Sequence, residues 1–268
     1  MRKQRRIAAY AVAFAAMLDV APAQAAQEAQ NTTQAPTAQR DVWTDITFEI
    51  IPEGWGEITG QRMLGTLVEQ LGKDPDMADF EREYPGVLDA FREALAPLMH
   101  SEVTKLTPLY RADLDALYRT NLDAIEAEQV LAFLRSSAFR NFRDKMISAS
   151  DFHTTVRDAV KGRDISQEAL AADTRTAALQ ASLQTDSADM KTMEAFLASP
   201  AGMKFKALNP EKFKIDHKWS NYLSPEAQAQ IEPLVFQAMI DHVAKTDPEV
   251  AQAMADELFK NPKGKITN

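Results

Sequence analysis

Hydrophobic residues recur every three or four positions along most of this chain, which is the spacing that places them on one face of an α-helix. The first clear stripe begins at Gln61 and ends at Gly72, a residue type that commonly terminates helices. Asp74-Pro75 then supplies a helix cap and a first-turn proline for a short helix that reaches Tyr84. Later helices are predicted to start at similar signals, namely Ser166, Ser224-Pro225 and Asp247-Pro248.

The longest hydrophobic stripe follows Pro85 and reaches Leu117. Pro97 and Pro108 lie inside it, and each proline removes a backbone donor from a helix. We therefore predict breaks or kinks near both prolines, so that this stretch forms a chain of helices and not one rod.

One segment departs from the helical pattern. Within residues 42–51 the hydrophobic residues Ile46, Phe48 and Ile50 alternate with polar ones. This alternation predicts a short strand or an extended segment packed on the helices, and residues 52–56 are expected to form a turn.

The composition favours helix over sheet. The chain has 268 residues, of which only 9 are Gly, and Ala, Glu, Leu, Met and Gln are common. We predict an all-α fold, a multi-helix array in which residues 41–262 form a single helical domain with a short extended N-terminal segment. Residues 263–268 are expected to form a tail.

The first 25 residues have the layout of a secretory signal peptide. A basic head is followed by a hydrophobic run over residues 7–18 and by the small-residue exit Ala23-Gln24-Ala25. The run is shorter than the roughly 20 residues that a spanning helix needs. We therefore expect cleavage after Ala25, a periplasmic location, and a flexible polar leader over residues 26–40.

The remainder of the chain is acidic and contains no cysteine. Loss of residues 1–25 would remove four basic residues and Asp19, leaving 26 basic and 38 acidic residues and a net charge of −12. This charge disfavours general nucleic-acid binding. The lack of cysteine excludes disulfides, thiolate metal sites and a lipid-anchoring cysteine. We expect no integral membrane segment after the signal peptide, since no later hydrophobic run approaches membrane length.

One short pattern occurs twice, 63 residues apart. Residues 132–138 and 195–201 share the pattern Ala-Phe-Leu-x-Ser-x-Ala, and each is followed by a further phenylalanine. Upstream, Asp123 and Asp186 occupy corresponding positions and have the features of helix N-caps with an acid in the first turn.

This pattern predicts a helix-turn-helix unit in which a serine ends the first helix and caps the second. We expect two such units near residues 123–146 and 186–209, packed as αα-hairpins that bury their phenylalanines. Pro200 would occupy the first position of the second helix in the later unit.

Residues 195–204, Ala-Phe-Leu-Ala-Ser-Pro-Ala-Gly-Met-Lys, resemble the signature of a bacterial family named domain of unknown function 2059, in which a helix ends in an aromatic-plus-Ser-Pro-x-Gly turn. The resemblance covers roughly residues 105–210, in one or two copies, and implies an exported helical protein. It brings no activity, cofactor or catalytic residue. The first copy departs from the signature, with Ser137 and Phe139 in place of the proline and glycine.

Two stretches concentrate positive charge in this acidic chain. Residues 135–145 and residues 204–218 each carry a net charge of +3 and include aromatic residues. One hypothesis is a basic, aromatic face, including Arg140, Arg143 and Lys204, that meets an anionic partner such as lipid head groups or an acidic protein. The alternative is ordinary amphipathic helices, with phenylalanines inward and cations outward.

The sequence carries no catalytic or metal-binding signature. It lacks a nucleophile elbow, a phosphate-binding loop and a dinucleotide fingerprint, whereas a catalytic carboxylate pair would leave no sequence signature at all. We therefore predict no catalytic, cofactor-binding or metal-binding residues. The four histidines have no zinc-type spacing: His100, His153, His217 and His242.

These observations favour a non-enzymatic periplasmic interaction or accessory protein, whose partner is an unknown envelope protein or an anionic surface. The alternatives are a hydrolase of an envelope polymer and a carrier of apolar ligands. Clustered carboxylates in a pocket would favour the hydrolase, and a deep apolar cavity would favour the carrier. A flat apolar patch rimmed by basic residues would favour the interaction protein.

Overall fold

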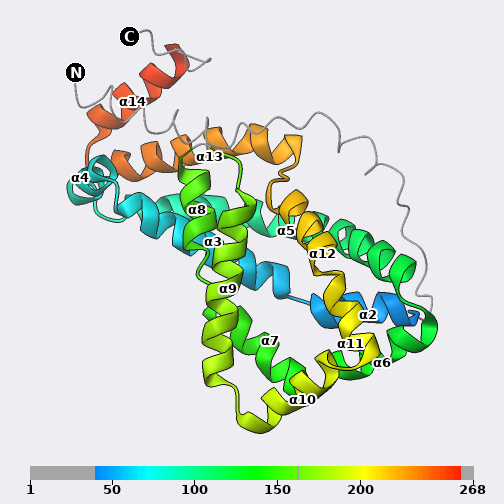
Figure 1. Ribbon diagram of the computed structural model, residues 1–268. Helices are drawn as coiled ribbons and strands as arrows, with labels where there is room; N and C mark the ends of the chain where they lie inside the picture. Colours follow the sequence, from blue (N-terminus) through cyan, green and yellow to red (C-terminus); the bar gives the residue numbers. More distant parts are fainter. Residues whose placement is uncertain (1–39, 162, 261–268) are drawn as a thin grey trace.

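The computed structural model describes residues 40–161 and 163–260, with side chains described up to residue 256. Every regular element in this part of the chain is an α-helix (Figure 1), so the predicted all-α class is confirmed. The predicted signal peptide, nearly all of the leader and the predicted tail lie outside the described residues. Among the described helices, none is long and apolar enough to cross a membrane.

The central element is α5, a helix of 35 residues from Val87 to Asn121. It packs against α3 (Trp55–Gly72), α13 (Pro225–Ala244), α2 (Val42–Ile50) and α12 (Asn209–Ser220). These neighbours divide into two groups, so the two halves of α5 belong to different hydrophobic cores.

The first core surrounds the N-terminal half of α5. Phe91 and Leu95 of α5 are buried there among side chains of α3, α4 (Pro75–Glu83), α13 and α14 (Pro248–Lys260). In Figure 1 these helices form the upper part of the molecule, and α14 is the last helix that is described.

The second core surrounds the C-terminal end of α5. Leu114 and Tyr118 of α5 are fully buried against Ile46 of α2 and against α6 (Ala124–Leu134). Side chains of the following helices pack onto this core from outside, so it contains both predicted helix-turn-helix units.

Three helices connect the two cores along one side of the molecule (Figure 1): α7 (Ser137–Ala149), α8 (His153–Val160) and α9 (Gln167–Gln184). α8 packs on α3, and α9 packs along α7 and α8. Arg62 of α3 donates hydrogen bonds to carbonyl oxygens at the C-terminal end of α7, including that of Ser148 at 2.7 Å. These bonds satisfy carbonyls that a helix end leaves without intrahelical partners.

The predicted helix caps are present. The side chains of Asp74, Ser166 and Ser224 each accept a hydrogen bond from a first-turn N–H of the helix that follows. The predicted end of α3 at Gly72 is also correct, although α3 begins at Trp55 and not at Gln61.

The prediction of an extended N-terminal segment is wrong, because residues 42–50 form helix α2. Asp41 caps this helix. Val42, Ile46 and Ile50 are spaced four residues apart, which is a helical spacing, and this spacing rather than the alternation describes the segment. Its β-branched residues have a high strand propensity, but burial of one face between α5 and α6 outweighs that propensity.

Of the breaks or kinks predicted near Pro97 and Pro108, the breaks are wrong, because α5 continues through both prolines as one helix. Each proline leaves the carbonyl four residues earlier, on Glu93 or Thr104, without its usual donor. All four residues are exposed. Water can therefore hydrate the freed carbonyls, and the helix continues at a tolerable cost.

We predict that Leu114→Ala lowers the free energy of unfolding by about 2–5 kcal/mol, because Leu114 is 0% exposed and its truncation leaves a cavity in the second core. Ile125→Ala is the matched control, because it also removes three carbons but from a side chain that is 72% exposed. Urea unfolding followed by circular dichroism measures both values. Equal, small effects of the two substitutions would contradict this placement of the core.

Candidate interaction surface

The two predicted units correspond to α6–α7 and to α10 (Ser187–Leu197) with α11 (Pro200–Ala207). Asp123 and Asp186 cap their first helices, and Asp123 forms a full capping box with Glu126. Ser136 and Ser199 cap the second helices, as the sequence predicts.

The turns of the two units make the same hydrogen bonds. Ser136 N and Ser199 N both donate to the carbonyl oxygen of the phenylalanine three residues earlier, each at 2.9 Å. The serine hydroxyls donate to the same carbonyls, at 2.6 Å on Phe133 and at 2.7 Å on Phe196. Both serine hydroxyls also accept from the second helix, so each turn carries one local network.

The units contact each other through their corresponding phenylalanines. The rings of Phe133 and Phe196 are stacked, with centroids 3.9 Å apart and planes 6° from parallel. The ring of Phe139 lies beside that of Phe133, and the ring of Phe205 lies beside that of Phe196. The ring centroids of Phe205 and Tyr118 of α5 are 5.6 Å apart. The aromatic cluster thus joins both units to the second core.

The polar contacts between the units are reciprocal. Lys204 of α11 donates to Glu126 of α6 at 2.6 Å, and Asn141 of α7 donates to Asp189 of α10 at 2.9 Å. Lys204 and Asn141 are 63 residues apart, as are Asp189 and Glu126. Each contact is therefore the counterpart of the other, an arrangement typical of a two-fold relation between units. The hydrogen bond from Lys204 lowers the pKa of the Glu126 carboxyl.

The surroundings of the two units differ at one face. α2 covers α6, and Leu134 of α6 is 0% exposed. α10 packs against α7 and α11, and none of its side chains is fully buried. Leu197, the counterpart of Leu134, is 37% exposed, and Met203 of α11 is also exposed. An apolar face that α2 covers on the first unit is thus uncovered on the second, within the described residues.

The first basic stretch is neutralised by α2. Arg135 binds Asp45 at 2.7 Å, and Arg140 binds Glu49 at 2.8 Å. Arg143 donates to the carbonyl oxygen of Glu49 and approaches the carboxylate of the same residue. The anionic partner of these arginines is therefore a helix of the same chain.

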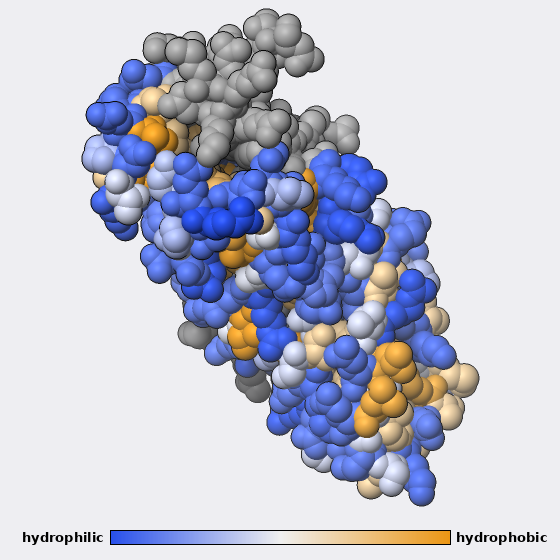
Figure 2. All heavy atoms as spheres, turned by 90° about the vertical axis from the view of Figure 1, so that its left-hand side faces the viewer, coloured by the Kyte–Doolittle hydropathy of each residue, from blue (hydrophilic) through white to orange (hydrophobic). Residues whose placement is uncertain are grey.

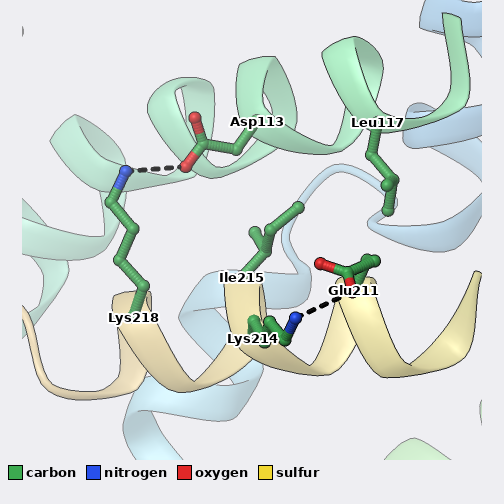
Figure 3. Close-up of a pocket in the computed structure, with 6 residues that line it drawn as sticks. All are labelled: Asp113, Leu117, Glu211, Lys214, Ile215 and Lys218. Atoms are coloured by element: carbon green, nitrogen blue, oxygen red, sulfur yellow. Dashed lines mark hydrogen bonds and ion pairs between the residues drawn. The ribbon is translucent and has the colours of Figure 1, made fainter. Parts of the chain in front are cut away.

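The second basic stretch borders a shallow groove between α5 and α12 (Figure 3), with a volume of about 390 Å³. Leu117 and Ile215 form its apolar floor. Lys218 binds Asp113 at 2.9 Å at one end, and Lys214 binds Glu211 at 2.8 Å at the other (Figure 3). Lysines of this stretch thus pair with acids of the chain, which favours the amphipathic-helix interpretation over a free basic face.

A hydrogen-bonded tyrosine also joins α5 to α12. Tyr110 of α5 donates to Asp216 of α12 at 2.6 Å, and Lys212 donates to the other carboxylate oxygen at 2.7 Å. Burial first, and the Asp216 charge second, raise the pKa of Tyr110 well above its ordinary value. The phenol therefore stays protonated and serves as a donor that holds α12 on α5.

The histidines take part in contacts between elements. His242 contacts the carbonyl oxygen of Pro85 at 3.0 Å, and His217 contacts that of Ile165 at 2.8 Å. His153 contacts Gln70 at 3.1 Å, and His100 lies 3.9 Å from Glu57. Within the described residues, no group of three or more His, Cys, Asp or Glu side chains is placed to hold a metal ion.

Comparison with known proteins found no matching family model, no matching curated protein and no matching solved structure.

We predict that Gly202→Ala lowers the free energy of unfolding by about 1–3 kcal/mol, because a Cβ there would lie 1.9 Å from the carbonyl oxygen of Phe196 and the turn would have to open. Gly65→Ala, in the exposed middle of α3 where nothing lies within 4 Å, is the control and should raise stability by about 0.5–1 kcal/mol. Thermal unfolding measures both, and a neutral Gly202→Ala would show that the turn is not close-packed.

Proposed function

We propose that this chain is an exported periplasmic accessory protein that binds another envelope protein through α10 and α11, without catalysing a reaction. The observation that carries the proposal is the uncovered apolar face of the second unit, which includes Leu197 and Met203. Exposed apolar residues gathered on neighbouring helices are typical of interaction sites.

The position of α2 on the first unit suggests what kind of partner fits the second. α2 is an amphipathic helix that lies across α5 and α6 and buries Ile46 completely. An amphipathic helix laid into a hydrophobic groove is a common mode of recognition. We therefore infer that the partner presents a helix to α10, in the way that α2 is presented to α6.

The second unit has fewer positive charges on this face than the first, so its partner helix should differ from α2. The arginines that hold α2 are Arg135, Arg140 and Arg143, and the corresponding positions of the second unit are Ala198, Met203 and Lys206. The second face offers fewer cations, so the acids of α2 would lose their ion pairs there. A partner helix with a broader apolar stripe and fewer acids fits better. Met203 adds a flexible side chain, which suits adaptable binding.

The periplasmic location rests on the sequence of residues 1–25, and the interaction role rests on the fold. The charged side chains at the groove of Figure 3 are engaged in ion pairs with one another. A general acid or base must be free to exchange a proton with a substrate, so these pairs support binding over hydrolysis.

We predict that a photo-crosslinking amino acid at position 197, introduced into the full-length protein in its native envelope, gives one dominant adduct with a different protein. The same probe at Ile58, another exposed hydrophobic residue but on α3, is the control and should not give that adduct. Mass spectrometry identifies both sets of products.

Leu197→Glu should abolish co-purification of the same partner, because a charge would be buried without a counter-ion in the complex. Ile58→Glu should leave it unchanged. Adducts that are equal at the two positions, or the lack of any adduct with another protein from position 197, would overturn the proposal and direct attention to polymer-hydrolysis and ligand assays.

A further inference from the structure

Met203 of α11 carries the most exposed thioether in the described part of the chain. The residue is 57% exposed. The chain has 11 methionines; Met1 and Met17 lie outside the described residues, and every described methionine other than Met203 is buried or half-buried. On the face that Figure 2 shows, hydrophobic residues form small groups within a mostly hydrophilic surface. An exposed methionine is thus an exception in this part of the molecule.

Methionine is the side chain of this protein that is most open to oxidation by peroxides. A cysteine thiolate would compete for the same oxidants, and the chain contains no cysteine. When hydrogen peroxide oxidises a thioether, a sulfur–oxygen bond forms, the O–O bond breaks and one water molecule is released. The sulfur loses two electrons and the peroxide gains them. The peroxide must reach the sulfur atom, so exposure decides which methionine reacts first.

The fold accepts a polar side chain at this position. The counterpart of Met203 in the first unit, 63 residues earlier, is Arg140, which is exposed and binds Glu49. A sulfoxide at Met203 would therefore remain hydrated at the surface and leave the helix packing as it is. This position contrasts with the methionines of the first core, where a sulfoxide would be buried among apolar side chains: Met77, Met239 and Met254.

We infer that Met203 is a site of reversible oxidation, and that its sulfoxide makes the uncovered apolar face of the second unit more polar. The inference rests on the proposed function, because Met203 shares this face with Leu197. Methionine sulfoxide is polar, so a partner helix that covers it gains less from apolar burial than one that covers a thioether. Enzymatic reduction of the sulfoxide restores the apolar side chain.

The order in which the methionines react tests the site without any partner. The purified folded protein is treated with hydrogen peroxide, and mass spectrometry of its peptides follows the oxygen added to each methionine. Met203 should react several-fold faster than the half-buried Met190 and Met193 of α10. In urea that unfolds the chain, the three rates should become similar, because the fold no longer shields any of them. A folded protein in which Met203 reacts no faster than Met190 and Met193 would overturn the inference.

Hydrophobic-interaction chromatography tests the change in the surface. The oxidised protein should elute earlier than the untreated protein, because the face has lost apolar area. Met203→Leu keeps a side chain of similar size without sulfur, so its elution should not change on treatment. Met99→Leu is the matched control, since it makes the same change at a half-buried methionine of α5 and should respond as the unaltered protein does.

Circular dichroism before and after treatment establishes that all of these proteins are folded. Unchanged elution of the unaltered protein, or an equal shift in Met203→Leu, would contradict the assignment of the polar change to Met203.

The photo-adduct from position 197 measures the effect on the partner. Treatment of the envelope with hydrogen peroxide should lower its yield several-fold in the otherwise unaltered protein and leave it unchanged when Met203→Leu is also present. An equal loss in both would show that oxidation acts elsewhere. If position 197 gives no adduct before treatment, the proposed function fails, whereas the reaction order and the elution shift still decide whether Met203 is the oxidation site.

Discussion

The rest of the structure depends on the continuity of α5. One helix supplies Phe91 and Leu95 to the first core and Leu114 and Tyr118 to the second. A helix advances about 1.5 Å per residue, so the length of α5 between these residues sets the separation of the two cores. Pro97 lies between Leu95 and Leu98 of the first core, and Pro108 lies between the two cores. Both prolines are exposed, and the helix continues through them.

The arrangement of the second core follows from that support. α2 packs against both α5 and α6, and the stacked rings of Phe133 and Phe196 join the two units. The basic residues that look available in the sequence are mostly engaged here: arginines of α6 and α7 hold α2, and Lys204 holds the units together. The exposed Leu197 and Met203 of α10 and α11 carry the proposed contact with a partner.

Local signals in the sequence predicted the fold well. Ser136 and Ser199 were identifiable as caps because a cap needs only a side-chain acceptor at the right offset from the helix start. The helix α2 was missed because its β-branched residues alternate over a short span, and only burial against α5 and α6 decides its conformation. The sequence does not predict that α5 continues through Pro97 and Pro108. Whether a proline breaks a helix depends on whether the carbonyl that loses its donor is exposed to water, and that exposure depends on the tertiary structure.

The surface was less predictable than the helices. The sequence places Leu134 and Leu197 in identical patterns, yet one is covered by α2 and the other is not. Likewise, the positive stretches suggested a basic face, because the acids that neutralise them lie far away in sequence, at Asp45 and Glu49 for the first stretch. Which residues are free to meet a partner depends on these long-range contacts.

The most direct test of this account is the length of α5 in solution. The chain contains no cysteine, so the double variant Glu93→Cys/Thr120→Cys carries spin labels at these two positions and nowhere else. Both positions are exposed, and they flank the two prolines. Pulsed electron spin resonance should give one narrow distance distribution centred near 40 Å, about the length of a continuous helix over this span. A maximum below about 30 Å, or two separate populations, would show that α5 is broken and would contradict the placement of both cores on one helix.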